Sequence, residues 1–494
     1  MLVNHSRLFI AIFMVAALLM SYFVFSNQSL RLDESQSLWQ TSFSAQRLLE
    51  IVASDVHVPF YHIILHYWQI LFGNDVAATR TLSLIFFIFT IPAVYLLGKI
   101  TYGKKTGIFA ALLITISPFL NWYGNEIRMY SLFVLLTVLN QYFFVKIYKN
   151  RKEGNRTWWL YAITAVSGAL THYFFLFQVV AQGIFYIFNK RLFEPRSLRK
   201  FLFVIAILSV ALGIWFSYVF SLDAIGFSRP RLAEPTTYNL FDTVMQFIFG
   251  FQNDHFNAMI VALWPITALL AFLTLTKNTK INHDTYYLVL SIAIPILLSF
   301  IISITIQPLY LTRYLIFTIP SIYIFLGWIF STYSPRVSSL AQVAIVAVML
   351  LMLFDQSVNK NLAVKENFRT AAEYLNERTG PRDAIIISPP FTIYPLEYYY
   401  RGHGTITTLP YWNRFTPGAI PEYSLEKLEE EATRLSKAYD AGWLLLSYDQ
   451  GYESEVKSYF DNHFQRLEAH ELSPGITLYS YKFNYDEDPL TQVR

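Results

Sequence analysis

The chain has 494 residues, of which 54% are hydrophobic, 18% are aromatic and only 15% are charged. Soluble domains carry about 25% charged residues, so this chain has too few charges to cover a water-facing surface. Soluble, disordered and collagen-like classes are therefore excluded. The absence of cysteine also excludes disulfides, thiolate catalysis and thiolate metal sites.

Apolar runs of membrane-spanning length follow one another along the first 354 residues. The first run, residues 8–25, is followed by no small-residue cleavage motif, so we expect it to be retained as a span. The later runs cover roughly 57–72, 80–98, 106–120, 130–148, 157–189, 201–221, 257–276, 285–306, 313–332 and 337–354.

Two of these runs do not have the length of one membrane span. Residues 57–72 form a short run with three histidines, and we expect it to lie along the membrane interface. Residues 157–189 are too long for one helix, so we expect a turn back at residues 171–173. Eleven spans then place the amino terminus in the cytoplasm and the carboxyl-terminal region outside.

The distribution of charge supports this topology. It places 17 of the 24 basic residues before position 355 on the cytoplasmic side, as the positive-inside rule requires. Of the 13 acidic residues in this region, 10 fall on the outer side. Because acidic residues have little influence on topology, we interpret their concentration on one face as a sign of a functional outer surface.

The composition changes near Asp355. Residues 355–494 hold 14 basic and 21 acidic residues and have the periodicities of a small α/β domain. Helices are expected at 366–378 and 424–438, and strands at 384–388, 442–447 and 476–483. We therefore divide the chain into a transmembrane domain, residues 1–354, and an extracytoplasmic (periplasmic) domain, residues 355–494. The sequence has no nucleotide-binding motif and no basic cluster typical of nucleic-acid binding, so no nucleic-acid partner is expected.

Polar residues beside the predicted spans are the candidates for chemistry. The first is the acidic pair Asp33 and Glu34, which follows Arg31 just beyond the first span. Charged groups near lipid are costly, and a partly buried carboxylate beside a cation is suited to act as a general base or a metal ligand. The alternative is a solvated pair at the interface with no chemical role.

Further candidates fall on the same predicted side of the membrane. His57 and Pro59 open the interfacial run, and Glu126, Arg128 and Tyr130 lie between two spans. An arginine at the mouth of a helical bundle is suited to bind a phosphate through two hydrogen bonds. The alternative is an exposed salt bridge between Glu126 and Arg128, worth at most about 1 kcal/mol.

Two later clusters complete the series. His172 and Tyr173 lie at the predicted hairpin turn, and Arg313 and Tyr314 precede the final spans. The convergence of five polar clusters on one face indicates a site more strongly than any one cluster does.

The order of these motifs resembles that of a known superfamily. An acidic pair after the first span, a His-x-Pro turn, Glu-x-Arg-x-Tyr, a His-Tyr hairpin tip and a late Arg-Tyr follow one another within residues 8–335. In this respect the sequence is similar to the type-C (GT-C) membrane glycosyltransferases, the group that contains protein O-mannosyltransferases and lipid A aminoarabinose transferases. The resemblance implies an α-helical polytopic membrane protein with about 11 transmembrane helices, interfacial helices and a small carboxyl-terminal extracytoplasmic α/β domain.

The resemblance also implies an activity and a site. The activity is transfer of a sugar from a polyprenyl-phosphate donor to an acceptor hydroxyl on the extracytoplasmic face of a bacterial inner membrane, with inversion. The residues implied are Asp33 and Glu34 as catalytic groups, Arg128, Arg313 and His57 as donor-phosphate ligands, and Glu126, Tyr130, His172 and Tyr173 as supporting groups. The sequence departs from the family at Val58, which stands where the family's His-Pro-Pro has its first proline.

The cofactor and the partners follow from the same resemblance. Relatives offset charge on the leaving phosphate with a divalent metal or with arginine. With only two adjacent acids, this sequence favours arginine, and a divalent metal is the alternative. The partners implied are a lipid-linked sugar donor, membrane lipids and a glycan, lipid or protein acceptor of the cell envelope.

Two other classes of function fit a polytopic membrane protein. A lipid or glycan transporter or flippase would place ionisable groups near the bilayer midplane, whereas the predicted spans are almost free of charge. An envelope assembly protein that binds partners through its outer domain would tolerate changes at Asp33 and Arg128. The transporter is the main alternative to the transferase.

Overall fold

The computed structural model describes residues 5–25, 28–55, 57–150, 154–222, 232–251, 282–359, 366–415 and 420–483. The chain divides into two compact units. The first unit comprises Met1–Asn27 and Thr41–Asn359, and the second comprises Gln28–Gln40 and Lys360–Arg494. The sequence placed the boundary at 354/355. The structure places it at 359/360 and adds the segment that carries Asp33 and Glu34 to the carboxyl-terminal unit.

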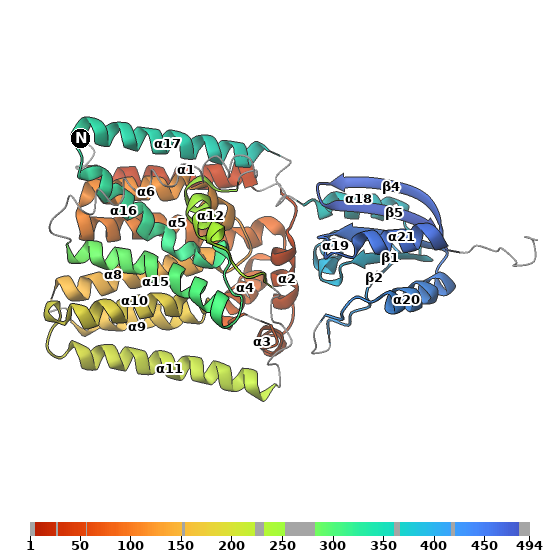
Figure 1. Ribbon diagram of the computed structural model, residues 1–494, viewed down its shortest axis with the longest axis horizontal. Coiled ribbons are helices and arrows are strands. Elements are labelled where there is room, and N and C mark those ends of the chain that lie inside the picture. Colours follow the sequence, from red (N-terminus) through yellow and green to blue (C-terminus); the bar gives the residue numbers. More distant parts are fainter. Residues whose placement is uncertain are drawn as a thin grey trace, which may run out of the picture. The chain divides into compact units, whose positions relative to one another are not determined.

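The first unit is a bundle of apolar helices that run alongside one another (Figure 1). Its long helices are α1 (Ser6–Phe25), α5 (Val76–Tyr102), α6 (Lys104–Ile116), α8 (Tyr130–Lys149), α9 (Asn155–Ala169), α10 (Phe175–Phe188), α11 (Ser197–Ser221), α15 (His283–Thr305), α16 (Ile319–Ser331) and α17 (Pro335–Val358). Shorter helices are α3 (Ala45–Ala53), α4 (Pro59–Phe72), α7 (Pro118–Gly124), η1 (Lys190–Leu192), α12 (Thr237–Phe249) and η2 (Thr312–Thr318).

Several of these helices have the length and composition of membrane spans. Among the described residues, six helical segments are long and apolar enough to cross a membrane, and counting the bent pair α6 and α7 as one span makes seven. The apolar segments Ser6–Tyr22 of α1 and Phe175–Phe188 of α10 are shorter than these spans, and the predicted span at 257–276 lies outside the described residues. Membrane-protein character is therefore supported, while eleven spans stay a prediction.

Two local expectations are met by the helix boundaries. The interfacial run forms α4, which has 14 residues and is not among the candidate spans. The long run at 157–189 breaks into α9 and α10, and the turn between them contains residues 171–173. The histidines of α4 and of this turn thus lie on segments that connect longer helices of the bundle.

Helices α5 and α6 approach closely where both carry glycine. A Cβ atom at Gly98 would lie 2.8 Å from the Cα atom of Gly107, and a Cβ atom at Gly107 would lie 2.6 Å from the carbonyl oxygen of Tyr95. Small residues at such contacts let helix backbones pack closely in a bilayer, where van der Waals packing replaces the hydrophobic effect between helices. The two glycines therefore determine the spacing of this helix pair.

A buried polar network joins helices α8, α9, α10 and α15. The Gln182 amide donates to Asn140 Oδ1 at 2.8 Å and to the Tyr287 hydroxyl at 3.2 Å, and its carbonyl oxygen accepts from the Tyr161 hydroxyl at 2.7 Å. The Gln178 amide also donates to Tyr287, at 3.2 Å. Because no water solvates polar groups in lipid, such groups must find partners inside the protein. The network therefore specifies how these helices are rotated against one another.

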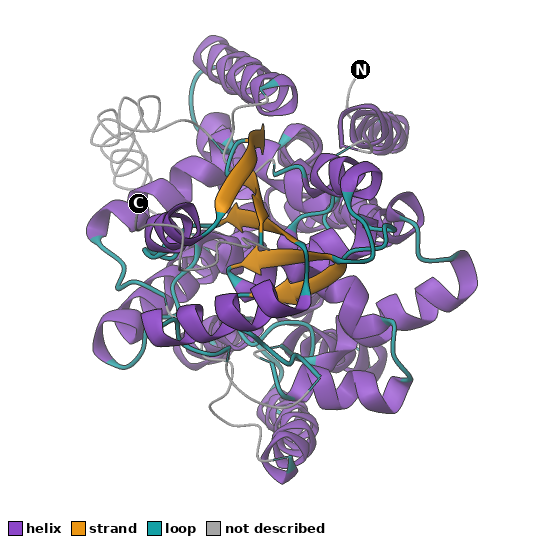
Figure 2. Cartoon of the chain, turned by 90° about the vertical axis from the view of Figure 1, so that its right-hand side faces the viewer, coloured by secondary structure: helices purple, strands orange, loops and turns teal. Residues whose placement is uncertain are grey.

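The second unit contains a five-stranded sheet in the order β2-β1-β3-β5-β4, coloured orange in Figure 2. Its strands are β1 (Asp383–Ser388), β2 (Thr405–Thr408), β3 (Ala441–Ser447), β4 (Gln465–Ser473) and β5 (Ile476–Lys482), and its helices are α2 (Leu32–Thr41), α18 (Phe368–Arg378), η3 (Pro390–Thr392), α19 (Ile393–Tyr399), α20 (Leu425–Ala438) and α21 (Glu453–His463). Strands β2, β1 and β3 are parallel, whereas β5 is antiparallel to both β3 and β4. The predicted strands at 384–388, 442–447 and 476–483 and both predicted helices are confirmed.

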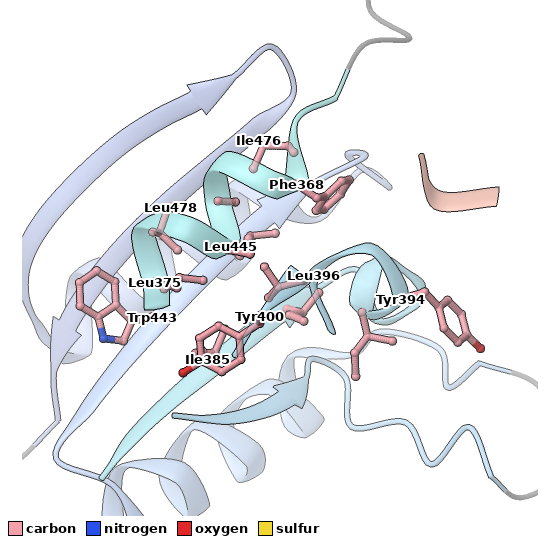
Figure 3. Close-up of a cluster of buried hydrophobic side chains, with 14 residues drawn as sticks. Phe368, Leu375, Ile385, Tyr394, Leu396, Tyr400, Trp443, Leu445, Ile476 and Leu478 are labelled. Carbon is pink, nitrogen blue, oxygen red and sulfur yellow. The ribbon is translucent and has the colours of Figure 1, made fainter. Parts of the chain in front are cut away.

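Alternation along the central strands gives the sheet two apolar faces. Ile385 and Leu445 pack with Phe368 and Leu375 of α18, as Figure 3 shows. Their neighbours in sequence, such as Ile386, point to the opposite face and pack against residues of α20 and α21. A sheet covered by helices on both faces buries its central strands completely, which explains their uninterrupted apolar sequences.

Helix α2 belongs to this second unit through contacts at both of its ends. The backbone N–H of Leu30 donates to the Tyr399 hydroxyl at 2.8 Å, and the Ser29 hydroxyl accepts from the backbone N–H of Arg369 at 3.2 Å. At the other end, the guanidinium of Arg414 lies 5.3 Å from the centre of the Trp39 ring. The segment that carries the acidic pair is therefore a helix held by the carboxyl-terminal unit.

Candidate functional site

The acidic pair lies in the first turn of α2, where the two carboxylates have different surroundings. Glu34 is completely buried, and its Oε2 atom accepts from the backbone N–H of Arg31 at 3.0 Å and lies 3.8 Å from Arg31 Nε. This contact is the acidic half of a capping box. Asp33 is partly exposed, and the positive end of the helix dipole stabilises its negative charge. Glu34 is thus engaged in holding the helix start, whereas Asp33 has access to solvent.

The other candidates lie in connections between helices of the first unit. The start of α4 is fixed to the α9–α10 turn by a hydrogen bond from the Phe60 N–H to the Leu170 carbonyl at 3.0 Å. It is fixed to the connection before α8 through Ser83, whose hydroxyl lies 3.1 Å from the Tyr61 hydroxyl and donates to the Arg128 carbonyl at 3.4 Å. Three connections distant in sequence therefore meet at one end of the bundle.

His57 and Arg128 are in direct contact at this end. Arg128 Nη2 lies 2.7 Å from His57 Nε2, and both side chains are buried. Arginine carries only donors, so Nε2 of His57 is the acceptor and the ring of His57 is neutral. Asp55 Oδ2 lies 4.0 Å from the same nitrogen. The predicted donor-phosphate residues His57 and Arg128 are therefore brought together.

Two further histidines lie in this region, and both are held neutral. His62 stacks on His57 with ring centres 5.6 Å apart, and burial, with His57 and Arg128 nearby, lowers the pKa of His62 to about 3. Burial is also the largest cause that lowers the pKa of His172 to about 3, and the charges of Arg128 and Arg313 lower it further. These interactions place His172 in the same electrostatic environment as both predicted phosphate-binding arginines.

The remaining supporting residues surround this centre in different ways. Tyr130, the first residue of α8, is fully buried with its ring centre 6.4 Å from that of His172. Glu126 is also buried. Arg313 is partly exposed in η2, with its guanidinium 5.7 Å from the centre of the Tyr314 ring. Tyr173 points elsewhere, since its hydroxyl accepts from Trp215 Nε1 at 3.1 Å.

The structure also reveals two residues that the sequence analysis missed. Glu366 lies near Asp33 and Arg31 and accepts a hydrogen bond from the Tyr448 hydroxyl. Glu366 is the first residue of a predicted helix and Tyr448 follows a predicted strand. The sequence therefore predicted the elements that carry them, but not the contact between the two side chains. In the sequence, Glu366 stands out from the other acidic residues only because it follows shortly after the apolar run 337–354. That is a weak signal.

The donor set in the described part of the chain does not fit a metal ion. No group of three or more His, Asp or Glu side chains is arranged there to hold one. Glu34 is occupied by Arg31, and His57 by Arg128. We therefore derive no step through a metal.

Comparisons with known proteins agree with this arrangement. Residues 56–219 match the model of the dolichyl-phosphate-mannose-protein mannosyltransferase family. No curated protein sequence matches the chain. The matched region begins beside His57 and contains Arg128 and His172, which are three of the residues that the structure groups together.

Solved structures share the fold over almost the whole chain. ArnT from Cupriavidus metallidurans in the apo state is similar with a TM-score of 0.65 at 11% identity, over 96% of this chain and 98% of that chain. ArnT bound to undecaprenyl phosphate gives 0.63 at 12% identity, over 95% and 97%. The arabinofuranosyltransferase AftD from Mycobacteria gives 0.55 at 12% identity, over 97% of this chain and 40% of that chain. At these identities the likeness shows the fold, and with the family match it confirms the resemblance to type-C glycosyltransferases.

Proposed function

We propose that this chain, which has the type-C glycosyltransferase fold, transfers a sugar from a polyprenyl-phosphate donor to an acceptor hydroxyl. The reaction takes place on the extracytoplasmic face of a bacterial inner membrane, with the amino terminus in the cytoplasm. The acceptor is a glycan, lipid or protein of the envelope. The mannosyltransferase family match over residues 56–219 and the fold shared with ArnT, which binds undecaprenyl phosphate, support this proposal.

The observation that carries the proposal is the grouping of Arg128, Arg313 and neutral histidines at one end of the bundle. A guanidinium matches the geometry of a phosphate and can bind it through two parallel hydrogen bonds. Arg128 and Arg313 therefore bind the donor phosphate. Neutral His57 holds Arg128 in place through the 2.7 Å contact.

Asp33 is the base in this proposal. The acceptor oxygen forms a bond to the anomeric carbon of the donor sugar, and its proton passes to the Asp33 carboxylate. The bond from the anomeric carbon to the phosphate oxygen breaks, and the lipid phosphate leaves with the electron pair. Attack opposite the leaving group inverts the anomeric centre, and the two arginines offset the charge that develops on the phosphate.

The other predicted site residues have supporting roles in this proposal. Glu34 holds the start of α2 through its bond to the Arg31 N–H. Tyr130 and Glu126 fix the connection that carries Arg128. Tyr173 acts at a distance from the phosphate, because its hydroxyl contacts Trp215 on α11.

The test is mass spectrometry of envelope glycans and lipids from a deletion strain that carries plasmid-encoded variants. We expect the deletion to remove one glycosylated product and the wild-type chain to restore it. D33N should restore none, because an amide accepts no proton. E34Q should restore part, since an amide oxygen still accepts from the backbone N–H of Arg31. Full restoration by D33N at matched protein abundance contradicts the role of Asp33 as base.

Donor binding is tested separately on purified protein with undecaprenyl phosphate as the probe. R128A should bind the probe at least tenfold more weakly than the wild type, since it loses a charge-assisted contact. R336A is the matched control, because Arg336 is an exposed arginine at the start of α17. Equal affinity of R128A and R336A contradicts the phosphate-binding role.

A further inference from the structure

Glu366 and Tyr448 form a partly buried pair in the second unit. Glu366 lies just before α18, and the Tyr448 hydroxyl donates to its Oε2 atom. Tyr448 follows β3 with φ of 53°, the one positive φ outside glycine among the described residues. The left-handed region is unfavourable for a residue that carries a Cβ atom. The sheet therefore holds Tyr448 in an unfavourable backbone conformation in which its hydroxyl reaches Glu366.

The pair lies beside the start of α2. The charge of Arg31 favours ionised Glu366 and the charge of Asp33 opposes it, so both residues are within electrostatic reach of Glu366. Leu32 and Tyr448 pack against the same apolar cluster, which contains Phe368 of α18. These residues belong to one compact unit, so their arrangement does not depend on the position of the bundle.

We propose that Glu366 and Tyr448 are positioning residues for Asp33, and that the charge on Glu366 controls how strongly Asp33 attracts the proton of the acceptor hydroxyl. This inference rests on the proposed function, in which Asp33 is the base. It adds a second carboxylate, 333 positions away in sequence, to the proton-accepting apparatus. Glu34 does not serve as this second carboxylate, because it already accepts a hydrogen bond from the backbone N–H of Arg31.

Coupled titration explains how the pair acts. Two neighbouring carboxylates repel, so each binds a proton more tightly when the other is charged. Burial raises the pKa of Glu366 to about 7, with Asp33 adding to the rise and with Tyr448 and Arg31 opposing it. Burial and the charge of Glu366 raise the pKa of Tyr448 as well, so its hydroxyl stays protonated and donates.

The direction of the pH dependence follows. Below about pH 7 Glu366 is neutral and Asp33 is the weaker base, whereas above it Glu366 is charged and Asp33 is the stronger base. Transfer should therefore rise as pH increases through the titration of Glu366. Among the described residues, the charged or titratable groups that act on Glu366 are Tyr448 from the end of β3 and Arg31 and Asp33 from the start of α2.

The first experiment measures the titration directly, without any donor. Infrared difference spectra of the purified full chain should contain a protonated carboxyl band that titrates near neutral pH in the wild type and is absent in E366Q. In D33N the titration should move to lower pH, because a repelling charge is removed. In Y448F it should move to higher pH by about one unit, because the ionised form loses a hydrogen bond. An unchanged midpoint in D33N overturns the coupling.

The second experiment measures transfer in detergent, with a lipid extract of the deletion strain as the source of donor and acceptor. The rise in kcat near neutral pH should disappear in E366Q, with about a tenfold lower plateau and an unchanged KM, and E366D should recover part of it. The matched controls are D461N and Y481F, since Tyr481 donates to Asp461 at 3.0 Å in a similar pair of the same unit.

The outcomes separate the two proposals. If D33N transfers sugar like the wild type, the proposed function fails whatever Glu366 does. If D33N is inactive but E366Q keeps the wild-type pH profile, or changes no more than D461N, the role of Glu366 fails alone. A loss of stability without a change in the pH profile would make Glu366 merely structural and would also overturn the inference.

Discussion

Nε2 of His57 lies 2.7 Å from Nη2 of Arg128, although the two residues are 71 positions apart in sequence. The contact joins the start of α4 to the connection that precedes α8. Because arginine has no acceptor atoms, the contact also determines that His57 carries its proton on Nδ1. One hydrogen bond thus fixes both the orientation of the guanidinium and the protonation state of its partner.

Removing this acceptor should weaken donor binding. In H57A the guanidinium of Arg128 loses a charge-assisted hydrogen bond, which is worth about 1.5–3 kcal/mol. We expect the affinity for undecaprenyl phosphate, measured by thermal-shift titration in detergent, to fall about tenfold or more. The control is H283A, since His283 bonds Asn189 at the start of α15. If H57A and H283A bind the lipid equally well, His57 does not position Arg128.

The low pKa of His172 should make the bundle sensitive to acid. The folded state holds the pKa near 3, whereas the unfolded chain has it near 6.5. Below pH 6.5 the unfolded state binds a proton that the folded state does not, so stability falls as pH falls. Between pH 6.5 and pH 5 the loss is about 2 kcal/mol. The free energy of unfolding should vary less with pH in H172Q than in H463Q, which changes an exposed histidine and serves as the control. The glutamine in H172Q keeps an acceptor for the Phe174 N–H. Parallel curves for both variants contradict the prediction.

The polar network around Gln182 should contribute measurably to stability. In Q182L the Tyr161 hydroxyl and Asn140 Oδ1 each lose a buried partner. We expect a loss of about 1–2 kcal/mol, the range seen for hydrogen bonds between membrane helices. Reversible unfolding in mixed micelles measures it, with Q342L as the control because Gln342 makes one bond within α17. A loss no larger than that of Q342L would show that the network adds no net stability.

The α5–α6 contact should be intolerant of a single methyl group. In G107A the new Cβ atom would lie 2.6 Å from the Tyr95 carbonyl oxygen and 2.9 Å from the Lys99 nitrogen, both of which belong to the backbone. Overpacking of this kind costs about 1–3 kcal/mol. G183A is the control, since a Cβ atom there meets nothing within 4 Å. Gel filtration after heating should recover less folded G107A than G183A, and equal recovery would contradict the close approach.

The proposed topology can be tested with single cysteines, because the chain contains none. Lys104 and Glu471 are both exposed, and the proposal places them on opposite sides of the membrane. A membrane-impermeant maleimide applied from outside should label E471C and spare K104C until the membrane is opened. Labelling of K104C in intact cells would reverse the assigned orientation.

Periodicity and motif order were enough to predict much of this fold. The apolar runs that fall on described residues form helices, and the strand 442–447 was recognisable as an uninterrupted apolar run because both of its faces are buried under helices. Strand β4 was missed since most of its side chains are exposed, so its polar sequence carries no strand pattern. Strand β2 has only four residues, which is too short for a periodic signal.

The sites were predictable only where neighbours in sequence are also neighbours in space. Asp33 and Glu34 were found as a pair. Which of them is buried and which reaches solvent depends on which carboxylate accepts from the Arg31 N–H, and that depends on the residue at which the helix begins. The contact between His57 and Arg128 could be guessed only from motif order. The meeting of Glu366 with Tyr448 depends on a left-handed backbone at Tyr448, which no sequence pattern indicated.

The membership of α2 in the carboxyl-terminal unit has a consequence for synthesis. The ribosome makes Asp33 before the later bundle helices, whereas Tyr399, Arg369 and Glu366, which surround the start of its helix, are made more than 300 residues later. A nascent chain that has completed its bundle helices therefore already contains Arg128 and Arg313, but the helix that carries Asp33 is unsupported. The start of α2 gains these contacts only after residues 366–399 have been translated, so chains terminated before them should be defective in transfer while retaining the bundle.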